Sequence, residues 1–332
     1  MMPVRLAANQ PPRFYRGGAE IATLRGGAPA EYGPEDWVAS CTTLFGEPLA
    51  GLSALPDGRW LRDAVRADPV SWLGPDRGDE PALLVKLLDA GQRLPVHCHP
   101  SDEWAKAHLG SRYGKTEAWI VVGTTTPDPT VHIGFREDAS ADAVAEWVRR
   151  QDTPGMLDAL NALPVRAGDT VFVPAGLPHA IGAGVFIVEL QQPTDLSVML
   201  EWTGFLDSAD GGHLGVGYET ALGCVDRSGW AAERVAGLIR HPAGDGPVVE
   251  LFGPAVDPFF RAQRIDARSG VRCEPGFAVL VVLSGAAELT TEDGERMALR
   301  KGDTVVVPHA AGSTAIVGDL VAIRCLPPGG PR

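Results

Sequence analysis

The chain has 332 residues, of which 45% are hydrophobic and 21% are charged, and this ordinary globular composition excludes an intrinsically disordered protein. The formal net charge is −13 at pH 7 without any basic block, so neither nucleic acid nor an anionic membrane surface is an expected partner. The 40 glycines and 28 prolines favour many short elements joined by tight turns, as in mainly β proteins.

The N-terminal and cysteine patterns predict a cytoplasmic protein. The N-terminus has no apolar stretch of signal-peptide length, and no later run approaches the roughly 20 apolar residues that span a bilayer. The five cysteines are odd in number and form no CxxC pair, which favours reduced thiols.

The first predicted elements are two strands and a short helix. Residues 81–90 form an apolar run, and a turn at Gly91 leads to a second extended run over residues 94–99, which together predict a hairpin. Ser101 is a typical helix-capping residue and predicts a short helix over residues 101–109.

Further strands are predicted to begin at Glu117 and Val131. Between residues 138 and 163 the apolar residues recur with helical spacing, which predicts a helical insertion. Strands are expected to resume after it.

An internal repeat indicates two copies of one β unit. Residues 166–190 resemble residues 300–325, because both place a Gly-Asp turn before an apolar strand that ends in proline, followed by a second turn and strand. Gly-Asp turns before strands also recur by chance in β proteins, and this alternative stays open. Ser313 stands in the second copy where the first has His179, so only the first copy is expected to carry ligands.

The boundary between the two units is predicted near residue 250, where Gly, Pro and Asp residues cluster and periodicity is weak. We expect an N-terminal metal-binding domain over residues 1–250, which includes the helical insertion. Residues 251–332 are expected to form a C-terminal domain that lacks metal ligands.

Four residues form a candidate metal site. His97 and His99 are two residues apart on a predicted strand, so both imidazoles face the same side, whereas Cys98 between them faces away. Glu117 begins a later strand, and His179 ends a Pro-Ala-Gly-Leu-Pro turn. The pattern GxxxxxHxH, then glutamate, then PxGxxH resembles the cupin signature. Three imidazoles and one carboxylate suit Zn, Mn, Fe, Co or Ni, and ligand type alone does not choose among them.

The chain also resembles the type I mannose-6-phosphate isomerases. The resemblance covers roughly residues 37–202 and rests on LLVKLLDAGQRLPVHCHPSDEWAKAH, GKTEAWIVV and VPAGLPHAIGAGVFIVELQQPTD. It implies tandem cupin domains, which are jelly-roll β-barrels, and a zinc-dependent aldose–ketose isomerase that acts on a sugar or sugar phosphate. By position it implies His97, His99, Glu117 and His179 as metal ligands, and Lys115 as the family's active-site lysine.

The sequence departs from this family at three positions. His97 replaces the glutamine that is usually the first ligand, and Pro95 replaces a serine that the family associates with the substrate phosphate. A proline offers neither a hydroxyl nor a backbone N–H. Val198 or Met199 stands where the family has an arginine proposed to act in catalysis.

These departures leave several hypotheses open. The leading one is a metal-dependent isomerase whose sugar is possibly unphosphorylated, with Lys115 as a general acid or base if burial lowers its pKa. Glu189, Asp195 and Glu201 are the candidates for the proton-abstracting base. The alternatives are an Fe or Mn cupin oxygenase and a non-catalytic sugar sensor. The sequence does not determine the sugar, the metal or the oligomeric state.

Overall fold

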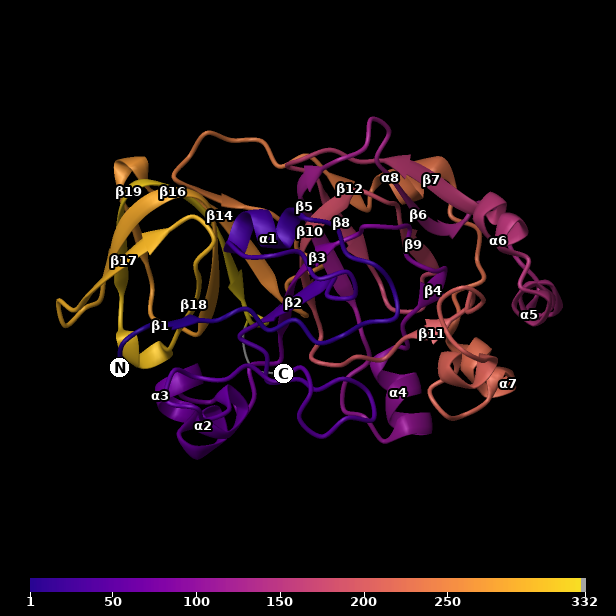
Figure 1. The fold of residues 1–332 in the computed structure, drawn as a ribbon, viewed down its shortest axis with the longest axis horizontal. Coiled ribbons are helices and arrows are strands. Elements are labelled where there is room, and N and C mark those ends of the chain that lie inside the picture. The colour runs from indigo at the N-terminus through magenta and orange to yellow at the C-terminus, as the bar shows by residue number, and fades with distance from the viewer. Residues whose placement is uncertain (330–332) are drawn as a thin grey trace.

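A computed structural model describes residues 1–329, and its strands form three antiparallel sheets (Figure 1). The six-stranded sheet has the order β12 (Ile239–Arg240), β8 (Thr170–Val173), β5 (Glu117–Thr124), β10 (Val185–Gln191), β3 (Leu84–Asp89), β2 (Glu35–Val38). The five-stranded sheet has the order β11 (Val198–Met199), β4 (His97–Cys98), β9 (His179–Ile181), β6 (Thr130–Phe135), β7 (Leu160–Pro164). The protein is therefore mainly β, as the sequence predicts.

The third sheet contains eight strands and forms the C-terminal part of the molecule, yellow and orange at the left of Figure 1. Its main order is β1 (Val4–Leu6), β18 (Thr304–Val307), β16 (Ala278–Thr290), β19 (Thr314–Leu326), β14 (Arg261–Asp266), β13 (Val248–Glu250). Two more strands join it, β15 (Val271–Cys273) beside β19 and β17 (Arg296–Arg300) beside β16.

Short helices lie around the sheets (Figure 1). The α-helices are α1 (Glu20–Arg25), α2 (Leu61–Ala67), α3 (Pro69–Leu73), α4 (Asp102–Leu109), α5 (Ala141–Arg150), α6 (Thr153–Ala159), α7 (Tyr218–Ala221) and α8 (Ala232–Ala236). The 3-10 helices are η1 (Ala209–Gly212), η2 (Leu222–Cys224), η3 (Ala267–Ser269) and η4 (His309–Ala311). No helix in residues 1–329 is both long and apolar enough to cross a membrane.

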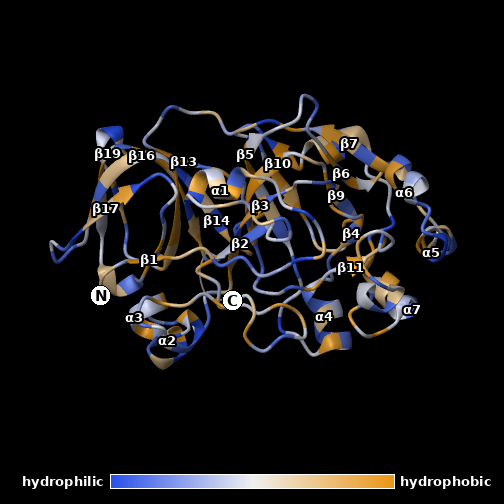
Figure 2. Ribbon diagram, viewed as in Figure 1, coloured by the Kyte–Doolittle hydropathy of each residue, from blue (hydrophilic) through white to orange (hydrophobic). Residues whose placement is uncertain are grey.

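Three apolar cores organise the two barrels. One core, which includes Trp119, Ile133 and Ile187, lies between the six-stranded and five-stranded sheets and fills the first barrel. A second core fills the C-terminal barrel. The third core joins the two barrels, because the outer face of the six-stranded sheet packs against β14, β16 and β19 through residues such as Val188 and Phe260. Apolar colour is accordingly concentrated on the strands, whereas α5 is mainly hydrophilic (Figure 2).

The predicted hairpin over residues 81–99 is wrong. β3 pairs with β2 and β10 in the six-stranded sheet, whereas β4 pairs with β9 and β11 in the five-stranded sheet. The intervening segment is a corner that carries the chain from one sheet to the other. A Cβ at Gly91 would lie 2.2 Å from the carbonyl oxygen of Gly17, so this corner requires glycine. A glycine between two apolar runs is compatible with both arrangements, and sequence alone did not separate them.

The helix predicted over residues 101–109 is confirmed as α4, and the Ser101 side chain accepts a hydrogen bond from the Trp104 N–H at its first turn. The helical insertion is confirmed as α5 and α6, but residues 160–163 belong to strand β7, which pairs with β6. The pairing with β6 overrides the weak helical period at the end of the insertion.

The internal repeat has matching turns in the two barrels. Asp169 accepts a hydrogen bond from the Arg166 N–H at 3.0 Å, and Asp303 accepts one from the Arg300 N–H at 2.9 Å. Gly168 and Gly302 both have positive φ, 94° and 86°, which favours glycine at this turn. The repeated sequence therefore encodes the same turn before β8 and before β18.

The division near residue 250 stays a prediction. β13, which ends at Glu250, and β1, at the start of the chain, both pair within the C-terminal sheet. The C-terminal barrel thus includes residues from both ends of the sequence.

We predict that Phe260→Ala lowers the free energy of unfolding by about 3–5 kcal/mol, because Phe260 is fully buried in the core between the barrels. The matched control is Phe45→Ala, since the Phe45 side chain is 50% exposed. Urea unfolding of both variants measures the difference. Equal destabilisation by the two substitutions would show that the barrels do not depend on this shared core.

Candidate metal centre

Three histidines meet inside the first barrel. His97 lies on β4 directly opposite His179 on β9, and His99 follows β4. All three side chains are buried, and their nearest nitrogen atoms lie within 4.8 Å of one another. The predicted same-side placement of His97 and His99 is confirmed by the contact between their rings, with centroids 4.9 Å apart.

Backbone carbonyl groups orient the three imidazoles. The Nδ1 atoms of His97, His99 and His179 each lie 2.8 Å from a carbonyl oxygen, of Pro95, Leu196 and Leu177 respectively. A carbonyl oxygen only accepts hydrogen bonds, so each Nδ1 carries the proton and each Nε2 keeps a free lone pair. This is the arrangement in which imidazoles bind a metal through Nε2.

Glu117, the first residue of β5, brings a carboxylate to the same place. One of its oxygens lies 3.1 Å from His99 Nε2 and the other lies 3.2 Å from His179 Nε2. Burial lowers the pKa of His99 to about 3, so this imidazole is neutral at pH 7. The neutral His99 ring therefore faces a carboxylate oxygen through its Nε2 atom, and a divalent cation between these groups would satisfy both. The donor set of three buried histidines fits a metal ion.

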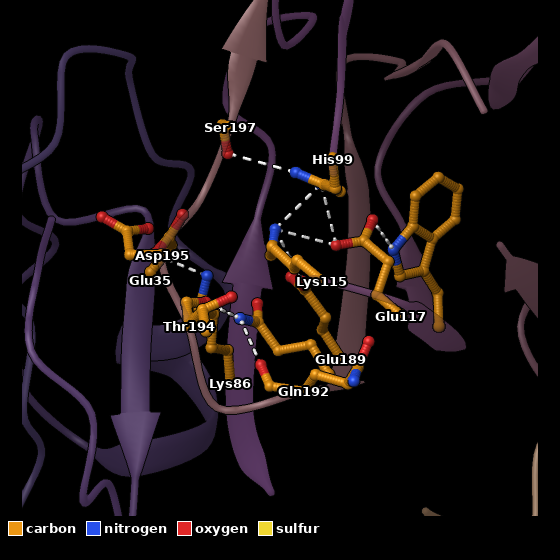
Figure 3. A network of polar contacts seen from close by, with 12 residues as sticks. Glu35, Lys86, His99, Lys115, Glu117, Glu189, Gln192, Thr194, Asp195 and Ser197 are labelled. Carbon is orange, nitrogen blue, oxygen red and sulfur yellow. Dashed lines mark hydrogen bonds and ion pairs between the residues drawn. The ribbon is translucent and has the colours of Figure 1, made fainter. Parts of the chain in front are cut away.

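Lys115 contacts two of these groups (Figure 3). Its Nζ lies 2.8 Å from a Glu117 oxygen and 2.9 Å from His99 Nε2. Burial acts to lower the pKa of Lys115, but the Glu117 and Glu189 carboxyl groups outweigh burial and raise it above its ordinary value. These carboxyl groups therefore oppose the lowering of the pKa that a neutral Lys115 amine would need, and they favour the charged ammonium group.

The three candidate bases have different surroundings. Glu189 on β10 and Asp195 line the same small cavity as His97 and Lys115. Burial raises the pKa of Glu189 to about 8 despite the neighbouring Lys86. Glu201 does not line this cavity and instead accepts two hydrogen bonds from Arg93, at 2.7 and 2.6 Å.

Glu201 also accepts a hydrogen bond from the Val96 N–H at 2.9 Å and one from the Thr153 hydroxyl at 3.2 Å. It thereby ties the segment before β4 to the helical insertion. These contacts indicate a structural role for the Glu201 carboxylate. The candidate bases near the histidines are therefore Glu189 and Asp195.

Two basic residues of the cavity were not identified from the sequence. Lys86 on β3 lies opposite Glu189 in the strand register, and its Nζ is 3.4 Å from Glu35. A lysine in the middle of an otherwise apolar strand was an available signal, since buried lysines are rare. Arg13 donates two hydrogen bonds to Asp195, at 3.1 and 3.2 Å. No local sequence pattern links Arg13 to Asp195, because only the whole fold brings them into contact.

The structure also shows where Val198 and Met199 lie, the two residues that could replace the arginine of the resembled family. Met199 lines the cavity, whereas Val198 faces an apolar cluster on the other side of the strand. Met199 is therefore the residue that takes the expected arginine's place beside the site. Cys98 faces that same cluster, 3.6 Å from the Cys224 sulfur, in agreement with its predicted orientation away from the two histidines.

The cavity above the histidines is small, with a volume of about 30 Å³. Such a space holds only about one or two water molecules. A sugar therefore reaches the histidines only when side chains that cover them move apart.

A family model described as the EutQ-like cupin domain matches residues 272–321. The mannose-6-phosphate isomerase of Streptococcus mutans is 28% identical over 270 residues, which are 79% of each chain. The mannose-6-phosphate isomerase ManA of Bacillus subtilis is 34% identical over 123 residues, 37% of this chain and 38% of the relative. The crystal structure of a mannose 6-phosphate isomerase from B. subtilis superposes with a TM-score of 0.78 at 22% identity, and 98% of this chain and 99% of that chain are covered.

The chain is thus similar to mannose-6-phosphate isomerases over most of its length. A phosphomannose isomerase variant from Salmonella typhimurium has the same fold, with a TM-score of 0.75 at 16% identity over 98% of this chain and all of the other. The predicted cupin fold is thus confirmed. The curated relatives agree with the predicted class of enzyme, an isomerase of sugars.

We predict that His179→Gln weakens metal binding at least about 100-fold, because loss of even an indirect partner of a metal ligand costs about 10–100-fold. His108→Gln is the matched control, since His108 lies exposed on α4. Metal content per chain, measured by plasma mass spectrometry after dialysis against defined metal buffers, gives the comparison. Equal metal content in both variants would exclude His179 as a ligand.

Proposed function

We propose that this protein is a metal-dependent aldose–ketose isomerase that acts on an unphosphorylated sugar. The observation that carries the proposal is the buried group of three histidines, Glu117 and the charged Lys115, of which His97, Glu117 and Lys115 line one small cavity. The relationship to mannose-6-phosphate isomerases supports the reaction class.

His97, His99, His179 and Glu117 would hold one divalent metal ion, and we propose zinc because the family resemblance of the sequence implies it. Such an ion would polarise the substrate oxygens and stabilise the negative charge of the enediolate. The remaining chemistry belongs to side chains of the chain itself.

Isomerisation removes a proton from the carbon next to the carbonyl and returns one to the former carbonyl carbon. A carboxylate can move this proton between the two carbons, and Glu189 and Asp195 are near enough to the histidines to serve. Lys115 would donate a hydrogen bond to the developing oxyanion, because its Nζ already lies among these groups. The proton that leaves one oxygen is balanced by the proton that the other oxygen gains.

The pairing of charges supports an unphosphorylated substrate. Each cation of the cavity has a carboxylate partner: Arg13 has Asp195, Lys86 has Glu35, and Lys115 has Glu117. A phosphate dianion would have to compete with these carboxylates inside the barrel. Pro95 at the cavity wall adds no hydrogen-bond donor.

Sugar binding requires the cavity to open, and we propose that the Arg13–Asp195 pair is the contact that shifts. Both side chains line the cavity, with exposed fractions of only 11% and 8%, and they come from distant segments of the chain. When the pair separates, Arg13 can bind a sugar hydroxyl and Asp195 becomes free to accept a proton.

We predict that metal-loaded protein interconverts a free aldose and its ketose, with deuterium uptake from solvent at the carbon next to the carbonyl. The protein is loaded separately with Zn, Mn, Fe, Co or Ni. Each preparation is tested with a panel of free and phosphorylated aldoses and ketoses, and the products are scored by NMR. A higher kcat/KM for a free sugar than for its phosphate is expected. No exchange with any sugar would overturn the isomerase proposal.

The same samples distinguish the other two functions. Oxygen consumption without deuterium uptake would indicate an oxygenase. Tight sugar binding without exchange would indicate a sensor. Faster turnover of a phosphorylated sugar would retain the isomerase and overturn the unphosphorylated substrate.

We predict that Lys115→Ala lowers kcat by about 100-fold to 10,000-fold, the usual contribution of a positioned acid or base, while the protein keeps its metal. Lys106→Ala is the matched control, because Lys106 lies exposed on α4. Turnover and metal content are measured on the same samples. Unchanged turnover in Lys115→Ala would remove this lysine from the mechanism.

A further inference from the structure

A second and larger cavity lies in the C-terminal half of the molecule. Its volume is about 730 Å³, within the range of about 300–1,000 Å³ that is usual for small-molecule sites. One wall comes from β14, β15 and the end of β19, and the other from residues 73–82 after α3. It shares no lining residue with the histidine cavity.

This cavity borders the strand pair β15–β19, whose second strand follows the counterpart of His179 in the internal repeat. In the first barrel β4 pairs with β9, and His97 is opposite His179. In the second barrel β15 pairs with the start of β19, and Cys273 is opposite Thr314. Ser313, the counterpart of His179 in the repeat, accepts a hydrogen bond of 2.8 Å from Arg272, which lines the cavity. Arg272 itself is exposed, whereas Cys273 beside it faces the core of the second barrel.

Two of the arginines lie side by side on one face of the sheet. Arg324 on β19 is opposite Gln263 on β14, and Arg261 lies two residues before Gln263, so the two arginines are diagonal neighbours. Ile265, on the same face of β14, lies in the core of the second barrel. Arg261 and Arg324 therefore stand at the mouth of this barrel.

The arginines of this wall are bonded to neutral groups. Arg324 donates to the Gln263 side-chain oxygen at 3.1 Å and to the Glu274 carbonyl at 3.2 Å. Arg261 donates to the Pro327 carbonyl at 3.5 Å. Within residues 1–329, no carboxylate lies within ion-pair distance of either guanidinium. Burial has the largest effect and lowers the pKa of Arg324; the Arg261 charge also lowers it, whereas Cys273, Glu250 and Glu274 act to raise it.

The acidic residues near the cavity bind other side chains or face solvent, so none of them pairs with these two arginines. Glu250 accepts a hydrogen bond of 2.6 Å from Gln263, and Glu80 pairs with Arg112 at 3.1 Å. Asp76, Asp79 and Glu274 line the rim but are exposed to solvent. Two like charges on one partly buried face, without a carboxylate in contact, are costly unless an anion binds between them.

We propose that this cavity is a binding site for a small organic phosphate, with the phosphate group held by Arg261 and Arg324. Guanidinium groups match the geometry of phosphate oxygens and bind them through paired N–H donors. Arg77, from the facing segment, lines the cavity and donates to the Pro328 carbonyl at 2.6 Å, so it reaches the same space from the other side. The apolar residues Leu73, Phe277 and Leu326 supply surface for the organic part of the ligand.

The test uses the full metal-loaded chain and isothermal titration with four probes: AMP, inorganic phosphate, adenosine and citrate. We expect AMP to bind more tightly than inorganic phosphate, and adenosine and citrate to bind weakly or not at all. Arg324→Met and Arg261→Met should each weaken AMP binding by about 10-fold to 100-fold, the usual effect of losing a hydrogen bond to a charged group.

Arg264→Met is the matched control. Arg264 is on the same strand as Arg261 but does not line the cavity, and its guanidinium donates to the Gly244 carbonyl. It should bind AMP as the unmodified protein does. In the absence of ligand, Arg324→Met should unfold at the same or a higher temperature, because it removes a partly buried charge that lacks a carboxylate.

Three outcomes would overturn the proposal: no binding of AMP or phosphate, AMP binding that is unchanged in both arginine variants, or citrate binding as tightly as AMP. None of these outcomes bears on the isomerase proposal, because Arg261 and Arg324 lie outside the histidine cavity.

Discussion

The candidate site depends on the three hydrogen bonds that fix the imidazoles to backbone carbonyl groups. Each carbonyl belongs to a segment beside a strand of the first barrel, so the barrel determines which nitrogen of each ring faces inwards. A buried neutral imidazole with its lone pair directed at a carboxylate is unfavourable by itself. The apolar core beneath, which includes Trp119, keeps this arrangement in place.

The same barrel also accommodates an unusual number of buried charges. Across the six-stranded sheet, Trp37, Lys86, Glu189 and Trp119 lie opposite one another in successive strands. Each tryptophan donates its indole N–H to a nearby glutamate, Glu35 or Glu117. The aromatic rings separate the charged groups from solvent while their N–H groups hold the carboxylates, so one residue type serves both packing and polarity.

The sequence predicted those features that short-range patterns encode. The HxH spacing, the PxGxxH turn and the repeated Gly-Asp turn each depend on a few neighbouring residues, and the structure brings His97, His99, Glu117 and His179 together. The predicted hairpin failed because a glycine corner between sheets has the same local signature as a hairpin turn. The Arg13–Asp195 pair could not be predicted, since it joins two segments that only the closed barrel brings together.

The pairing of β1 with β18 has a consequence for how the chain is made. Residues 4–6 are synthesised long before their partners at residues 304–306. β1 therefore has no β18 edge to pair with until those residues have been made, and it has to remain unpaired in the meantime. The segment around Arg13 does not wait for this pairing, because the Arg13 N–H donates to the Tyr32 carbonyl and the Gly17 N–H donates to the Glu31 carbonyl, so the wall of the histidine cavity can form before the C-terminal barrel closes.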